Sequence, residues 1–356
     1  MDGTAIVVCD GLYATPNGKT AHGLVRGTER YRLLGVIDAP TAGRDAGEVL
    51  DGVRRGIPVF ATIAAALGAL PEKPDFCVVG VATSGGRVTP GLRALLFEAI
   101  DSGMSVVNGL HEFVSDDPQL SAAAERKGVS IRDVRKTGPR TDLHFWSGSI
   151  LSVSAPRLAV LGTDCAIGKR TTARFLLEAC RKEGIRTELI YTGQTGWMQG
   201  SPFGFVLDSV PNDFVSGELE HSIVSCFETA QPDLILIEGQ SALRNPSGPC
   251  GSELILSGRA KGVILQHAPG RVCYEGLEEF DLRIPPVADE IALIRTLGAR
   301  TLAVALNGEG MTPEALRAEQ QRLGWGLHIP IVRPLEEGVG ALMPVVRDFL
   351  ARQSRP

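Results

Sequence analysis

The 356-residue sequence is poor in aromatic residues, which make up 5 %, and it contains no block of lysine or arginine. Its formal net charge is −5. Surfaces that bind nucleic acid need clustered positive charge, and many of them add aromatic side chains that stack on the bases. The composition therefore argues against a nucleic-acid-binding protein.

Paired cysteine motifs, long apolar runs and a basic N-terminal region are also missing. The seven cysteines are an odd number, none stands in a C-x-x-C pair, and most lie within apolar runs. This usage is typical of a reducing compartment and argues against a disulfide framework or a zinc cluster. The start, Met1-Asp2-Gly3, is unlike a signal peptide, and no apolar run reaches the ~18 residues of a membrane span. We expect a cytoplasmic protein that binds neither a metal nor a membrane.

Apolar residues make up 44 % and charged residues 22 %, as in ordinary globular proteins. Short β-branched runs alternate with amphipathic helical patterns in both halves, which predicts two α/β domains with parallel sheets covered on both faces. In the first half we expect strands at 5–9, 32–37, 76–81, 105–107 and 129–133, and a helix at 91–102. In the second half we expect strands at 157–161, 188–191, 234–237, 263–266 and 302–306, and helices at 169–183, 216–229, 313–322 and 339–351. A linker over 136–155 separates the halves, and we place the domains at 1–145 and 146–356.

The strongest functional signal is the segment from Leu158 to Thr172, which reads L-A-V-L-G-T-D-C-A-I-G-K-R-T-T. An apolar strand leads into a loop, and a helix begins at Lys169. The backbone N–H groups and the helix N-terminus of such a loop favour anions, and the lysine adds a charge for a phosphate oxygen. We expect a phosphate-binding loop, the alternative being a plain strand-to-helix turn. The expected cofactor-binding residues are Gly162, Thr163, Asp164, Cys165, Ala166, Ile167, Gly168, Lys169, Arg170, Thr171 and Thr172.

Two features separate this loop from the standard pattern G-x-x-x-x-G-K-[ST]. Gly162 lies one residue too far from Gly168, a spacing similar to that of the dethiobiotin-synthetase branch of P-loop proteins. The residue after Lys169 is Arg170 instead of the Ser or Thr whose hydroxyl holds Mg²⁺. An arginine there repels a metal ion, so the loop suits a ligand whose phosphates need no metal, such as coenzyme A. A second Gly-Lys-Thr, Gly18-Lys19-Thr20, lacks the glycine-rich lead and is interpreted as a turn or helix start.

Polar residues follow several expected strands, at the edge where ligands bind on open parallel sheets. Glu238 is a candidate general base, the alternative being a carboxylate that caps a turn. Asp213 is a second candidate base or a helix cap, and His267 is a candidate for proton transfer or a structural hydrogen-bonding residue. Cys165 is either a nucleophile at a helix N-terminus or a small residue required by the curved backbone. The expected substrate-binding residues are Gly193, Gln194, Thr195, Asn212, Gln240, Ser241 and the possible carboxylate clamps Arg244 and Arg271.

Seven short motifs occur in a fixed order along the chain. They are Gly11-Leu12, Lys19-Thr20-Ala21, Asp133-Val134-Arg135-Lys136, Gly162 to Lys169, Thr192 to Trp197, Asn212-Asp213-Phe214 and Glu238-Gly239-Gln240. In this order they resemble the D-glutamate N-acetyltransferase-like family over nearly the whole chain. The sequence departs from the family at 241–245, where Ser-Ala-Leu-Arg-Asn replaces a Gly-Ser-Leu-Leu-His type of run, and at Thr137, where the family has proline.

The resemblance implies a Rossmann-like N-terminal domain and a P-loop NTPase-like C-terminal domain. It also implies an enzyme that moves an acetyl group from acetyl-CoA directly to the amine of an acidic amino acid, D-glutamate in this family. The reaction needs anchored CoA phosphates, a base for the amine, and donors at the carbonyl oxygen. The phosphate loop would anchor the CoA phosphates. The base would be Glu238, Asp213 or His267. The donors at the carbonyl oxygen would be backbone N–H groups near Gly193 or Gly239.

Two other functions remain open on the sequence. One is a Mg²⁺-ATP- or GTP-dependent ligase or kinase of the dethiobiotin-synthetase type, with the metal at Asp164 or Glu238. The other is a non-catalytic nucleotide-binding protein. In either case we expect a small-molecule ligand rather than nucleic acid or a membrane. We also expect a homo-oligomer, since an apolar, glycine-rich chain of two sheets favours self-association.

Overall fold

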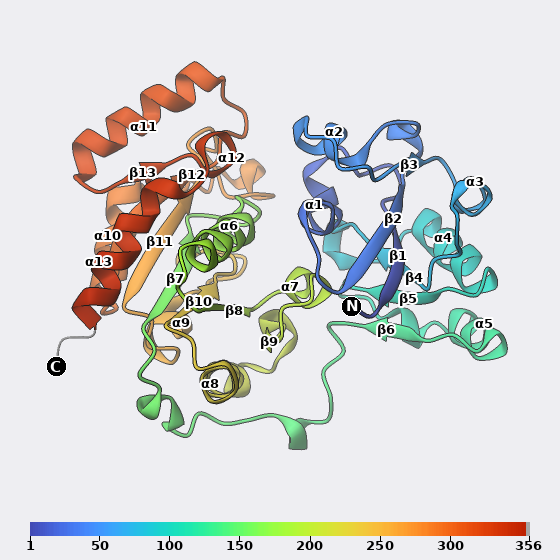
Figure 1. Cartoon of the computed structure of the whole chain (residues 1–356), viewed down its shortest axis with the longest axis horizontal. Helices are drawn as coiled ribbons and strands as arrows, with labels where there is room; N and C mark the ends of the chain where they lie inside the picture. The colour runs from blue at the N-terminus through green and yellow to red at the C-terminus, as the bar shows by residue number, and fades with distance from the viewer. Residues whose placement is uncertain (354–356) are drawn as a thin grey trace. The chain divides into compact units, whose positions relative to one another are not determined.

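The computed structural model describes residues 1–353 as two α/β units (Figure 1). The first unit comprises Met1–Gly138 together with Gln194–Ser201. The second comprises Pro139–Gly193 and the chain from Pro202 onward. The structure thus divides the chain after residue 138 instead of 145, and it assigns a short segment of the second half to the first unit.

The first unit is built on a parallel sheet of six strands in the order β3-β2-β1-β4-β5-β6. Its strands are β1 (Gly3–Val8), β2 (Tyr31–Ile37), β3 (Val59–Phe60), β4 (Phe76–Val79), β5 (Ser105–Asn108) and β6 (Ile131–Asp133). Its helices are α1 (Lys19–Arg26), α2 (Ala46–Asp51), α3 (Ile63–Ala69), α4 (Pro90–Asp101), α5 (Pro118–Lys127) and α7 (Gln194–Met198). Strand β1 reads GTAIVV and buries its last five residues, as a central strand covered on both faces must.

The second unit is a parallel sheet of seven strands in the order β13-β12-β11-β7-β10-β8-β9. Its strands are β7 (Arg157–Gly162), β8 (Thr187–Tyr191), β9 (Phe203–Gly204), β10 (Leu234–Glu238), β11 (Gly262–His267), β12 (Arg300–Leu306) and β13 (Ile331–Val332). Its helices are α6 (Lys169–Lys182), α8 (Asn212–Ala230), α9 (Ser252–Leu256), α10 (Val287–Thr296), α11 (Pro313–Leu327), α12 (Pro334–Glu337) and α13 (Met343–Gln353). The central strand β7 lies between β10 and β11, and the phosphate loop follows it.

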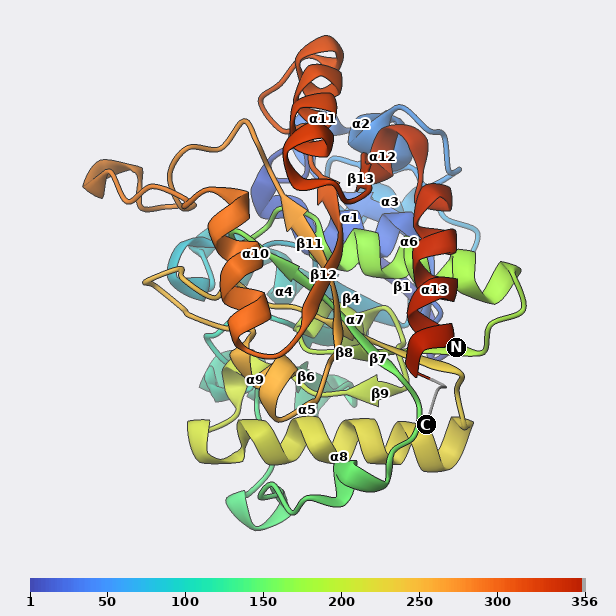
Figure 2. The same cartoon turned by 90° about the vertical axis from the view of Figure 1, so that its left-hand side faces the viewer.

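Helices cover both faces of the second sheet and form two apolar layers. One layer contains Leu219 of α8 and Ile294 of α10. The other contains Leu176 of α6 and Phe349 of α13. Figure 2 shows α10 and α13 on opposite sides of β11 and β12. Because both faces of the sheet are buried, its strands are nearly continuous apolar runs, which explains why the sequence reveals them.

Hydrogen bonds hold the linker between the two sheets against helix α8. The backbone N–H groups of Ser147 and Ile150 donate to the buried Glu220 carboxylate at 2.5 and 3.1 Å. Burial alone would raise the pKa of Glu220, but these hydrogen bonds stabilise the carboxylate and lower its pKa below the ordinary value. Helix α8 carries Gly217 where the linker crosses, and a β-carbon there would lie 1.9 Å from the carbonyl oxygen of His144.

The structure confirms the predicted α/β class and shows a strand at each of the ten predicted positions. Three strands escaped prediction, namely β3, β9 and β13, because each has two residues and so no alternation to read. Helix α1 begins at Lys19, as the helix-start interpretation of Gly18-Lys19-Thr20 requires. No helix among residues 1–353 is long and apolar enough to cross a membrane.

Replacing Gly217 by alanine should weaken the attachment of the linker to α8. The added methyl group overlaps a backbone oxygen, so we expect the free energy of unfolding to fall by about 1–3 kcal/mol. Gly326→Ala in α11 is the matched control, because open space surrounds Gly326 and alanine favours a helix by roughly 1 kcal/mol. Urea denaturation measures both variants. Equal stability of Gly217→Ala and Gly326→Ala would contradict the packing described.

Candidate functional site

The phosphate loop lies at the carboxyl edge of the second sheet, between β7 and α6. Its backbone curls through left-handed conformations at Ala166 (φ 51°) and Gly168 (φ 98°). Within residues 1–353, the backbone N–H groups of residues 164–168 donate no hydrogen bond to another group. Consecutive donors at the N-terminus of α6 form an anion-binding site of the kind that phosphates occupy.

Lys169 is held inside the loop. Its ammonium group donates to the carbonyl oxygens of Asp164 at 2.6 Å and Ser241 at 2.8 Å. Gly162 makes this position possible, since a β-carbon there would lie 2.8 Å from Cδ of Lys169. The side chain is buried, and burial lowers the pKa of Lys169. The lysine is thus positioned as the point charge expected from the sequence.

Arg170 forms a buried ion pair with Glu238, the last residue of β10. The guanidinium donates to Oε2 of Glu238 at 2.7 Å, and their side chains are 12 % and 5 % exposed. The backbone N–H of Thr192 donates to the same oxygen at 3.3 Å. In metal-dependent phosphate loops, the hydroxyl after the lysine and an acidic residue of a nearby strand hold Mg²⁺. Here the residue after the lysine is an arginine, and its guanidinium contacts that acidic residue.

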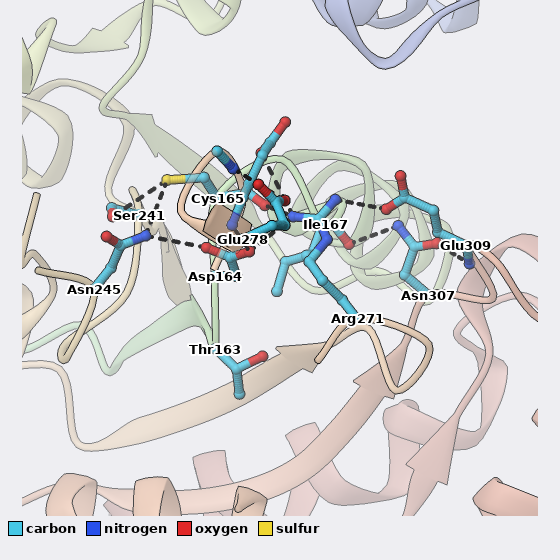
Figure 3. Close-up of polar contacts among 12 residues, drawn as sticks. Thr163, Asp164, Cys165, Ile167, Ser241, Asn245, Arg271, Glu278, Asn307 and Glu309 are labelled. Atoms are coloured by element: carbon cyan, nitrogen blue, oxygen red, sulfur yellow. Dashed lines mark hydrogen bonds and ion pairs between the residues drawn. The ribbon is translucent and has the colours of Figure 1, made fainter. Parts of the chain in front are cut away.

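Asp164 is the centre of a second network, drawn in Figure 3. Its buried carboxylate accepts from Asn245 Nδ2 at 3.1 Å, from Arg271 at 2.9 Å and from the backbone N–H of Glu275 at 2.9 Å. Arg271 also donates to the carbonyl oxygen of Cys165 at 2.8 Å and to Glu309 at 2.7 Å. These bonds fix the shape of the loop from the outside.

His267 ends β11 beside the loop. Its Nδ1 lies 2.9 Å from the hydroxyl oxygen of Thr163, and burial lowers its pKa to about 4. The imidazole is therefore neutral near pH 7 and is a weak base for an ammonium group. The hydrogen bond to Thr163 favours the structural interpretation of His267. Thr172, on the first turn of α6, donates to Gln266 at 2.6 Å and ties the helix to the same strand.

The segment after β10 contributes polar side chains to the wall of the loop. Cys165 Sγ lies 3.3 Å from Ser241 Oγ and 3.8 Å from Asn245 Nδ2. Gln240 donates to Thr192 Oγ1 at 3.0 Å and lies 3.0 Å from where a β-carbon of Gly193 would be. Gly193, Gln240 and Ser241 are thus brought to one edge, as predicted.

Four predicted substrate-binding or catalytic residues lie on helices α7 and α8. Gln194 and Thr195 begin α7 and belong to the first unit, where Arg135 donates to Gln194 at 2.9 Å and Thr20 lies 3.4 Å from Thr195. Asn212 and Asp213 form the exposed first turn of α8, which starts four residues before the predicted helix. Asp213 is therefore not the helix cap, and its catalytic role stays a prediction.

The sequence did not point to several residues that complete these networks. They are Asn245, Glu275, Glu290, Asn307 and Glu309. Asn307 directly follows β12 and donates to the carbonyl oxygen of Ile167 at 3.0 Å, so its place after a strand was a usable signal. Glu275 and Glu290 follow no strand directly, and nothing local distinguishes them from surface acids.

A central strand, a glycine-containing loop and a lysine at the start of the next helix define the second unit as a P-loop domain, joined to a Rossmann-like domain. The chain belongs to the DUF1611 family. Residues 144–343 match its P-loop domain and residues 39–137 match its Rossmann-like N-terminal domain, both described as domains of unknown function. A crystal structure of a DUF1611 family protein from Anabaena variabilis is 28 % identical, superposes with a TM-score of 0.86 and covers 98 % of this chain and 99 % of that one.

Two curated relatives are named D-glutamate N-acetyltransferase. The protein from Tritonibacter scottomollicae is 28 % identical over 271 residues, which is 75 % of this chain and 79 % of the relative. The protein from a Pseudoalteromonas species is 28 % identical over 274 residues, with the same coverage. The resemblance stated from the motifs is confirmed at the level of the family.

Separating Arg170 from Glu238 should destabilise the second unit. Arg170→Met leaves a buried carboxylate without its cation, which costs about 3–5 kcal/mol, and Glu238→Gln should recover part of this loss in the double variant. Thermal unfolding of the single and double variants gives the coupling energy. The exposed pair Arg186–Asp233, 2.6 Å apart, is the control and should couple by less than ~1 kcal/mol. Additive losses at Arg170 and Glu238 would show that the pair is unimportant.

His267 should make the protein less stable in mild acid. Its folded pKa of about 4 lies below the ordinary 6.5, so the unfolded chain binds a proton first and stability falls as the pH drops from 6.5 to 4, by ~3 kcal/mol at most. Melting temperatures across this range, for the wild type and His267→Gln, measure the effect. His267→Gln should lose less stability than the wild type as the pH falls. The control His328→Asn, at an exposed site, should lose as much stability as the wild type. The same acid loss in His267→Gln would contradict the assignment.

Proposed function

We propose that this protein is an N-acetyltransferase that transfers the acetyl group of acetyl-CoA to the amine of an acidic amino acid, with D-glutamate as the acceptor. The observation that carries the proposal is the Arg170–Glu238 pair beside an otherwise complete phosphate loop. The names of the two relatives supply the reaction and the acceptor.

The phosphate loop would bind a phosphate group of CoA without a metal ion. The N–H groups of residues 164–168 and the Lys169 ammonium provide the donors. The Arg170 guanidinium balances the Glu238 carboxylate at the place where a phosphotransferase keeps its Mg²⁺. CoA phosphates only anchor the cofactor during acyl transfer, so this reaction requires no metal at them.

Acetyl transfer then requires a neutral amine at the thioester carbonyl. The amine nitrogen forms a bond to the carbonyl carbon and the oxygen becomes negative. The carbon–sulfur bond then breaks as the amide forms, and the proton lost by the nitrogen goes to the leaving sulfur, so that CoA departs as the thiol. The backbone N–H at Gly193, at the carboxyl edge, is the donor that we assign to the developing oxyanion. The N–H of Gly239 already donates to the carbonyl oxygen of Val160 at 3.0 Å. Glu238 is occupied by Arg170 and by Thr192, so we assign it a role in charge balance and in loop geometry.

The alternative, a Mg²⁺-ATP-dependent ligase or kinase, shares the P-loop domain. It requires a cation site next to Lys169. Arg170 stands where such a site has a hydroxyl, and its 2.7 Å contact occupies the acidic residue Glu238. A guanidinium also repels a divalent ion. The geometry therefore favours the acetyltransferase.

Ligand-induced stabilisation distinguishes the two functions. We expect CoA in the presence of EDTA to raise the melting temperature, because a ligand at 100 times its Kd adds ~2.7 kcal/mol, and Mg²⁺-ATP to leave it unchanged. Lys169→Ala should abolish the CoA shift, while the control Lys182→Ala, exposed at the end of the same helix, should keep it. Stabilisation by Mg²⁺-ATP but not by CoA would refute the proposed function.

A further inference from the structure

Cationic side chains surround the phosphate loop, and most are satisfied by protein groups. Lys169 binds two carbonyl oxygens, and Arg170 is paired with Glu238. Arg271 contacts three carboxylates, those of Asp164, Glu275 and Glu309. An arginine already surrounded by three acids is a poor partner for another carboxylate, so the structure argues against Arg271 as the clamp for an acidic acceptor.

Arg244 differs from these cations. Its Nε donates to Oε2 of Glu290 at 2.8 Å, but its NH2 nitrogen is buried and has no hydrogen-bond partner among residues 1–353. Oε1 of Glu290 is also buried without a partner. A buried donor without an acceptor costs about 1–3 kcal/mol, and such groups in native proteins call for an explanation. The Arg244 side chain as a whole is 31 % exposed, so it lies at the boundary between the core and the solvent.

The surroundings of Arg244 suit a carboxylate. Tyr274, in the loop between β11 and α10, is 4 % exposed and lies within electrostatic range of Arg244, Glu290 and Asp164. Its hydroxyl makes no hydrogen bond within residues 1–353. A guanidinium with an unused nitrogen and a phenol with an unused hydroxyl are the donors that bind carboxylates with good geometry.

Arg244 also lies in the chain between two residues that contact the phosphate loop. On one side, the carbonyl oxygen of Ser241 accepts from Lys169 at 2.8 Å. On the other, Asn245 donates to Asp164 at 3.1 Å. Figure 3 shows Ser241 and Asn245 beside Asp164 and Cys165. A ligand bound by Arg244 would thus lie next to a cofactor bound in the loop.

We propose that Arg244 binds a carboxylate of the acceptor amino acid, with the Tyr274 hydroxyl as a second donor and Glu290 as the residue that positions the guanidinium. This inference rests on the proposed acetyltransferase function and names the residue of this chain that binds the acidic acceptor. Glu290 holds Nε of Arg244, which leaves the guanidinium nitrogens for the substrate.

Steady-state kinetics of Arg244→Gln tests the proposal, with CoA release as the readout. We expect the KM for D-glutamate to rise roughly 10- to 150-fold, the range for a lost hydrogen bond to a charged group, while the KM for acetyl-CoA changes less than about twofold. Arg244→Lys keeps the charge and should give a smaller rise, which guards against a folding defect in the first variant. The control is Arg283→Gln, an exposed arginine in the loop between β11 and α10 that pairs with Asp281, and it should leave both KM values unchanged.

Glu290→Gln separates positioning from structural support. The amide can still accept from Nε but has no charge, so we expect the KM for D-glutamate to rise with little change in kcat. A merely structural role would change kcat and the KM for acetyl-CoA as well, and that result would remove Glu290 from the proposal. Tyr274→Phe should raise the KM for D-glutamate by a smaller factor than Arg244→Gln.

The failure of this proposal is distinguishable from the failure of the proposed function. If the wild type acetylates D-glutamate and Arg244→Gln and Arg244→Lys keep its KM, the acetyltransferase assignment stands and the role of Arg244 is wrong. If the wild type neither binds CoA nor acetylates D-glutamate, both are overturned.

Discussion

The chemistry of the phosphate loop depends on one ion pair, that between Arg170 and Glu238. A phosphate loop supplies N–H donors and a lysine, and on its own it does not determine which phosphate chemistry follows. Two further residues determine whether a divalent cation binds beside the phosphate. They are the residue after the lysine and the acid at the end of the neighbouring strand. In this protein they bind each other at 2.7 Å in a buried position. Under the proposed function, the loop therefore anchors a phosphate that needs no metal ion.

The order of the strands brings the other groups to this anchor. Because β7 lies between β10 and β11, the ends of those strands and the segments that follow them form the walls of the loop. The acids of these segments neutralise Arg271, and the segment after β10 carries Arg244 with one nitrogen unused. Under the proposed function, the same topology separates the cations at the phosphate loop from Arg244, which we assign to the acceptor.

Much of this was predictable from the sequence, and the limits have physical causes. Buried parallel strands are apolar runs, and the loop, Lys169, Arg170 and Glu238 follow such runs directly. The structure assigns Gln194 and Thr195 to the first unit, because α7 packs there, and no local pattern reports which unit a five-residue helix joins. The ion pairs of Arg244 and Arg271 join residues 46 and 107 positions apart. Only the folded chain shows which arginine is neutralised.

A crystal structure with CoA, grown in EDTA without added metal, tests the central claim most directly. The account predicts a CoA phosphate on the backbone N–H groups of residues 164–168 and on Lys169, with Arg170 still paired to Glu238. The account is contradicted if CoA lies elsewhere and the loop is empty. It is equally contradicted if a phosphate binds only after Mg²⁺ is supplied and Arg170 moves away from Glu238.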